Sequence, residues 1–124
     1  MPDLGPEARY LGYLAEGRFM LQRGPETGQA VFPPRLRAPG GQAPLEDWQE
    51  MSGRGTVHSV TLQHRRDGPP RVIALIDLAE GGRMLSRLTG AGAEDIAIGA
   101  PVRARIAREA EVPHVVFEPE GEAP

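Results

Sequence analysis

The side chains best suited to chemistry near neutral pH are the three histidines His58, His64 and His114. His58 and His64 fall on the same face of one predicted strand but six residues apart, which separates them by roughly 20 Å at the rise of a strand. They cannot chelate one ion, and His114 could reach either only through the tertiary fold. We therefore expect three unrelated histidines and no zinc or iron site.

The sequence also offers no set of residues suited to nucleophilic or acid–base catalysis. The chain has no cysteine, which excludes disulfides and thiolate nucleophiles, and no serine lies in a Gly-x-Ser-x-Gly elbow. The segment from Gly90 to Glu94 begins like a dinucleotide-binding fingerprint but lacks its third glycine and a long helix. Asp77 stands in an apolar segment, where burial would shift its pKa or pair it with an arginine. We expect a structural ion pair there in preference to a general base.

Every basic side chain besides histidine is arginine, and the net charge is −3. Lysine chemistry is therefore absent, whereas planar, bidentate arginine contacts remain available. Arg54, Arg65, Arg66 and Arg71 are expected near one end of a barrel, where they suit an anionic small ligand or a protein partner. Nucleic acid is a weaker fit, because the negative chain offers few aromatic side chains on which bases could stack.

The elements that position these residues begin with a helix. Pro6 suits a first helical position and Gly17 a stop, and Tyr10, Tyr13 and Leu14 form one apolar stripe between them. The 124 residues amount to one domain with room for a small appendage, and 16 glycines and 13 prolines argue against an all-helical chain. No run is long and apolar enough to span a membrane, and the N-terminus lacks a signal-peptide pattern. We expect a cytoplasmic protein.

The rest of the chain reads as strands. Two short ones are expected at 18–22 and 29–32, followed by a loop at 36–44. Five further strands are expected at 56–63, 71–78, 83–88, 101–106 and 115–117, with a helical turn at 94–96. This is the outline of a mainly β protein with a five-stranded OB-fold barrel. The predicted core is Val60, Leu62, Val72, Ala74, Ile76, Leu85, Val102, Ala104, Ile106 and Phe117.

Several segments, in order, resemble the acyl-CoA-associated zinc-ribbon/OB-fold proteins. They are Gly17-Arg18, Leu21-Gln22-Arg23, Phe32-Pro33-Pro34-Arg35, Trp48, Ser52 to Val57 with Ser59, and Ile98 to Val102. The resemblance implies an N-terminal helix, a rubredoxin-like zinc ribbon and a C-terminal OB barrel. It also implies a non-catalytic partner of thiolases, of condensing or retro-aldol enzymes, or of hotdog-fold hydratases. We divide the chain into helix and ribbon (1–47), barrel (48–117) and a flexible acidic tail (118–124).

The ribbon departs from the family. Typical members carry two Cys-x-x-Cys pairs, and the equivalent positions here are Gly24, Thr27, Ala38 and Gly41. Because structural zinc supplies folding energy, a metal-free ribbon must be held by other contacts. We expect it to be held by packing of Phe19, Leu21, Val31 and Phe32, by the prolines or by a partner, with mobile turns at Gly24–Gly28 and Leu36–Gly41.

The leading hypothesis is an accessory subunit in a hetero-oligomer with an acyl-CoA enzyme, without a cofactor of its own. Exposed aromatic and arginine side chains often dominate interfaces. The partner-contact candidates are Tyr10, Tyr13, Leu14, Phe32, Pro33, Pro34, Arg35 and Trp48. Arg54, Arg65 and Arg66 are candidates to lie near a coenzyme A phosphate at a site shared with the partner. The alternative is a barrel that itself binds acyl-CoA or single-stranded nucleic acid.

Overall fold

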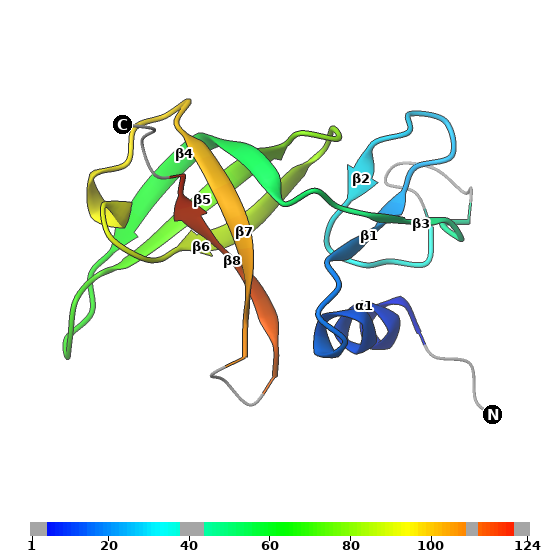
Figure 1. Cartoon of the computed structure of the whole chain (residues 1–124), viewed down its shortest axis with the longest axis horizontal. Coiled ribbons are helices and arrows are strands. Elements are labelled where there is room, and N and C mark those ends of the chain that lie inside the picture. Colours follow the sequence, from blue (N-terminus) through cyan, green and yellow to red (C-terminus); the bar gives the residue numbers. More distant parts are fainter. Residues whose placement is uncertain (1–4, 38–43, 109–111, 121–124) are drawn as a thin grey trace.

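The structure, a computed structural model, describes residues 5–37, 44–108 and 112–120. A β-barrel stands beside a small sheet, and a helix lies against that sheet (Figure 1). The helix and small-sheet elements are α1 (Pro6–Ala15), β1 (Met20–Arg23), β2 (Ala30–Val31) and β3 (Trp48–Glu50). The barrel elements are β4 (Arg54–Gln63), β5 (Arg71–Leu78), β6 (Arg83–Leu88), the 3₁₀ turn η1 (Ala93–Asp95), β7 (Pro101–Ala107) and β8 (His114–Pro119).

The barrel confirms the predicted OB-fold. Its strands close in the order β4-β5-β6-β8-β7, and η1 lies between β6 and β7. All neighbours are antiparallel except β6 and β8, which run parallel. Each barrel strand thus has a neighbour on both sides, although β4 pairs with β7 only from Arg54 to Thr56 and β6 with β8 only at Leu88.

The small sheet has the order β2-β1-β3. Strand β3 was not predicted, because its three residues carry no periodic pattern and it pairs with β1 from far along the chain. Helix α1 begins at Pro6 as predicted, and Gly17 ends the turn after it with a positive φ of 83°. The chain can reverse there because glycine tolerates that backbone conformation.

Two residues of the predicted core are wrong. Leu62 is 40% exposed and Leu85 is 57% exposed. On β6 the interior positions are instead taken by Met84 and Leu88, because the alternation of the strand points Leu85 outward. The other predicted core residues are buried or pack partly buried against the core.

Strand β4 contains a bulge at His58. Val57 pairs with Ile76 and Ser59 pairs with Leu75, which leaves His58 as the extra residue. The bulge shifts the alternation by one residue, so Val57 is fully buried while Val60, three residues later, also packs against the core. The sequence pattern had placed Val57 and Val60 on opposite faces.

The small sheet and the barrel share one hydrophobic cluster, which runs from Tyr10 and Leu14 to Phe117. Backbone contacts also join them: Ala30 N–H donates to Gly81 O at 3.2 Å. Ser52 N–H, in the connection between them, donates to Glu80 Oε2 at 2.6 Å. The turn between β5 and β6 therefore braces the small sheet against the barrel.

Candidate partner-binding surface

The apolar stripe of α1 faces inward, against the expectation that it is exposed. Tyr10 is 8% exposed and Leu14 is completely buried, and the Tyr10 ring meets Phe32 edge-on with centroids 6.0 Å apart. A helix this short gains its stability from packing an apolar face, and the small sheet supplies the surface. Tyr10 and Leu14 are therefore core residues, and a partner could not reach them without unpacking the helix.

Burial raises the pKa of Tyr10 from 10.0 to about 12. Between these values the unfolded chain loses this proton and the folded chain keeps it, so we expect stability to fall as the pH rises from 10 towards 12. Phenolate absorbance should show a step near pH 12. That step should disappear in Tyr10→Phe and persist in Tyr13→Phe. If it survives in Tyr10→Phe, Tyr10 is not its source.

Two of the predicted contact residues do form an accessible aromatic cluster. Tyr13 and Trp48 are half-buried with ring centroids 5.4 Å apart, and the Arg18 guanidinium lies 5.2 Å over the Tyr13 ring. Accessible aromatic and arginine side chains in contact with one another are typical interface anchors. The sequence predicted Tyr13 and Trp48 but missed Arg18, which follows the helix directly.

A groove of about 610 Å³ borders this cluster. Trp48, the start of α1 and exposed Leu36 contribute to its walls. The groove brings together Trp48, a predicted contact residue, and Leu36, which the sequence analysis had placed in a loop.

The segment from Phe32 to Arg35 is divided between core and surface. Phe32 is half-buried against Tyr10, whereas Pro33 and Arg35 are exposed. The backbone of Arg35 is fixed by the amide of Gln22: Oε1 accepts from Arg35 N–H at 2.9 Å and Nε2 donates to Arg35 O at 2.7 Å. The exposed side chains of Pro33 and Arg35 thus stand on a backbone that the Gln22 amide fixes at Arg35.

Gln22 itself is 1% exposed. Its Nε2 also donates to Leu45 O at 3.1 Å. We call the loop expected at 36–44 the second knuckle. One amide on the central strand β1 thus joins the chain on both sides of it, since Arg35 precedes this segment and Leu45 follows it. Packing, the prolines or a partner were expected to hold this part, and the hydrogen-bonding role of Gln22 was missed.

We call the turn from Gly24 to Gly28, which contains the first pair of would-be ligand positions, the first knuckle. It is closed by backbone hydrogen bonds. Gly24 N–H donates to Gln29 O at 2.8 Å and Gly28 N–H to Gly24 O at 2.9 Å. A side-chain Cβ at position 24 would lie 2.7 Å from Thr27 Oγ1, so positions 24 and 27 face each other as a ligand pair would. Thr27 Oγ1 instead accepts from Gln29 N–H at 3.2 Å.

The donor set does not fit zinc. Positions 38 and 41 lie outside the described residues, and the sequence gives them alanine and glycine. Across residues 5–37, 44–108 and 112–120, no three histidine, cysteine, aspartate or glutamate side chains come together to hold a metal ion.

The predicted arginine cluster is wrong for Arg54. Arg54 begins β4, whereas Arg65 and Arg66 follow the end of that ten-residue strand, about 30 Å away at the rise of a strand. Arg65 Nε donates to Pro69 O at 3.1 Å within the β4–β5 turn. Only Arg65, Arg66 and Arg71 lie at the same end of the barrel.

Asp77 pairs with an arginine, as predicted. Its Oδ1 accepts from Arg83 Nε at 2.6 Å, and its Oδ2 lies 3.2 Å from His58 Nδ1. The hydrogen bond from Arg83 is the largest cause that holds the pKa of Asp77 below its usual value. A carboxylate this acidic and engaged through both oxygens is a poor proton acceptor near neutral pH. The arrangement is an exposed ion-pair network on the barrel.

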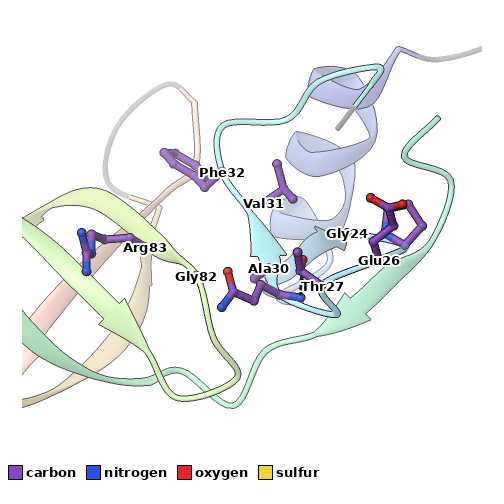
Figure 2. Close-up of a pocket in the computed structure, with 10 residues that line it drawn as sticks. Gly24, Glu26, Thr27, Ala30, Val31, Phe32, Gly82 and Arg83 are labelled. Carbon is purple, nitrogen blue, oxygen red and sulfur yellow. Dashed lines mark hydrogen bonds between the residues drawn. The ribbon is translucent and has the colours of Figure 1, made fainter. Parts of the chain in front are cut away.

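A cavity of about 360 Å³ lies between the first knuckle and the β5–β6 turn. Figure 2 shows Thr27 and Glu26 on the small-sheet side, Arg83 and Gly82 on the barrel side, and Phe32 at one margin. The cavity was not predicted, because no sequence pattern brings Gly82 near Thr27. It depends on the packing of two segments some fifty residues apart.

No helix in the described ranges is both long enough and apolar enough to cross a membrane.

Comparison with known sequences identifies the barrel. Residues 48–107 match the family model described as the ChsH2 C-terminal OB-fold domain. The 3-oxo-4,17-pregnadiene-20-carboxyl-CoA hydratase alpha subunit of Mycobacterium tuberculosis is 53% identical over 57 residues, which are 43% of this chain and 18% of that protein. A probable enoyl-CoA hydratase alpha subunit of Thermomonospora curvata is 39% identical over 62 residues, which are 45% of this chain and 19% of that protein. The chain thus spans less than a fifth of these relatives.

Solved structures match nearly the whole chain. A chain of the Ltp2-ChsH2(DUF35) aldolase superposes with a TM-score of 0.77 and 27% identity, covering 96% of this chain and 98% of that one. A protein of unknown function from the DUF35 family of Sulfolobus solfataricus gives 0.68 and 18%, covering 94% and 87%, and shows the fold alone. The barrel of this chain, over residues 48–107, is thus similar to the ChsH2 C-terminal OB-fold domains.

Proposed function

We propose that this chain is a non-catalytic accessory subunit that binds an aldolase, thiolase-like or hydratase enzyme of acyl-CoA metabolism in a hetero-oligomer. The observation that carries the proposal is the whole-chain similarity to a chain of the Ltp2-ChsH2(DUF35) aldolase. The hydratase alpha subunits named above support the acyl-CoA context. The accessible Tyr13–Trp48–Arg18 cluster and its groove supply a surface for a partner.

The alternative function, binding of single-stranded nucleic acid by the barrel, requires exposed aromatic rings on the barrel. Phe117, the phenylalanine of the barrel, is completely buried, and Trp48 packs against Tyr13 outside the barrel, with the two rings tilted by 59°. Single-strand binding uses exposed aromatic rings on which bases can stack. A protein partner therefore fits the described surface better.

Affinity purification of the tagged chain from its native host tests the function. We expect one acyl-CoA enzyme of the aldolase, thiolase or hydratase class to co-elute in fixed stoichiometry, identified by mass spectrometry and size-exclusion chromatography. A chain that emerges alone and monomeric would contradict the proposal. Turnover of acyl-CoA by the isolated chain would contradict its non-catalytic part.

We further propose that the small sheet folds without zinc, held by the Gln22 amide and by the backbone bonds of the first knuckle. Metal analysis of the purified chain should find far less than one zinc per molecule, and a strong chelator should leave the unfolding midpoint unchanged. The reason is that no metal free energy enters the folding balance. Stoichiometric zinc would overturn this proposal and leave the accessory function standing.

A further inference from the structure

The outer face of β5 and β6 carries an aliphatic patch. Leu85 exposes 57% of its surface and stands directly opposite Leu75. Ile73 is the next outward position on β5, and both Ile73 and Leu75 remain half-exposed between buried neighbours. We call Ile73, Leu75 and Leu85 the outer patch. Adjacent exposed aliphatic side chains at the centre of a sheet face mark an interaction surface when polar residues rim them.

The rim of the outer patch is basic. Arg87 stands opposite Ile73 and Arg83 opposite Asp77, and Arg71 begins β5. Asp77, on the same face, is already neutralised by Arg83 and approached by His58. Residues 54–88 hold six arginines and three acidic residues, although the whole chain carries a net charge of −3. On the outer face itself, Arg71, Arg83 and Arg87 outnumber Asp77, so the rim of the patch carries a local positive charge.

We propose that the outer patch docks a partner protein whose surface offers an apolar socket bordered by carboxylates. The proposal rests on the proposed function and names a surface for it that is separate from the Tyr13–Trp48–Arg18 cluster. Electrostatic complementarity selects the partner's sign, because the arginine rim attracts acidic side chains and repels basic ones.

The same charges argue against a second copy of this chain. In a symmetric dimer the same surface meets itself, so the rim arginines of both copies would be brought together. Nucleic acid would gain from the arginines, but the centre of the patch is aliphatic and offers no ring for a base to stack on. A protein surface with an apolar socket bordered by carboxylates complements both the aliphatic centre and the basic rim of the outer patch.

Binding of purified variants to the purified co-eluting enzyme tests the patch, with affinity measured by calorimetry. Leu85→Asp should weaken binding by about tenfold or more, as expected for a central interface residue. Leu85→Thr, which keeps a strand-favouring residue, should weaken it in the same direction if the aspartate variant fails to fold. Val112→Asp, at a 53% exposed valine between β7 and β8, is the matched control and should bind as the wild type does.

The sign of the partner is tested by two substitutions at Arg87. Arg87→Glu should weaken binding and Arg87→Lys should largely preserve it, and added salt should slow association of the wild type. A basic partner rim would give the reverse order and overturn the proposal.

The outcomes separate the patch from the function. If the wild type binds the enzyme and both Leu85 variants bind equally well, the patch proposal fails and the accessory function stands. If the wild type does not bind at all, both fail. If Leu85→Asp instead converts a dimer of this chain to a monomer, or abolishes binding of a single-stranded oligonucleotide, the patch serves a different occupant and the proposal is overturned.

Discussion

Gly82→Ala is expected to lower the free energy of unfolding by about 2–5 kcal/mol. Gly82 has a φ of 94°, and an alanine in that conformation costs roughly 1–2 kcal/mol. A Cβ at this position would also collide with the carbonyl of Ala30 on β2, and overpacking of that kind costs about 1–3 kcal/mol. Urea denaturation followed by the fluorescence of Trp48, which lies in the small sheet, measures the loss.

Gly99→Ala is the matched control. Gly99 has nearly the same φ, 90°, and no other atom within 4 Å of its would-be Cβ. It should show only the backbone strain, a loss of roughly 1–2 kcal/mol. Equal losses in the two variants would mean that the junction between the β5–β6 turn and β2 moves to accommodate a Cβ without further cost, and would contradict the close approach of Gly82 to Ala30.

The order of the barrel strands could be predicted from the sequence because each of them is marked locally. The apolar run from Arg71 to Leu78 ends in the Ala79–Gly82 turn, and both its bounds and those of Arg83–Leu88 are as predicted. Such signals depend on neighbours along the chain. The barrel order then follows from the few ways in which five short strands close.

The inward face of two strands could not be predicted, for different reasons. On β4 the bulge at His58 changes the alternation midway, and no residue type there announces an inserted position. On β6 both alternating sets contain a leucine, Leu85 in one and Leu88 in the other. The choice is made by the pairing of β6 with β5 and β8 across the barrel.

Only part of the candidate site could be predicted from the sequence. The reason is that the exposure of a side chain depends on tertiary packing. The stripe of α1 was recognised, but whether Tyr10 and Leu14 meet a partner or their own chain depends on where the small sheet lies. Trp48 and Tyr13 stayed accessible because β3 places the indole at the margin of that sheet. The outer patch was missed altogether, since Leu85 had been assigned to the core.

Gln22→Leu is expected to destabilise the small sheet by about 2–4 kcal/mol, although leucine is close in size to glutamine. The substitution leaves the N–H and C=O of Arg35 and the C=O of Leu45 without their partner. Each buried polar group left unpaired costs about 1–3 kcal/mol, and burial of the leucine recovers part of the loss. Trp48 fluorescence should report a urea midpoint lower by about 1 M or more.

Gln63→Leu serves as the control for the Gln22 prediction, because Gln63 is an exposed glutamine at the end of β4. Surface substitutions of this kind usually change stability by no more than about 0.5 kcal/mol. If Gln22→Leu is equally mild, the amide is not what holds the second knuckle, and packing of Phe19, Leu21 and Val31 is sufficient. If only Gln22→Leu unfolds the small sheet and zinc does not restore it, one buried amide provides the cross-link that the absent cysteines would otherwise form through metal.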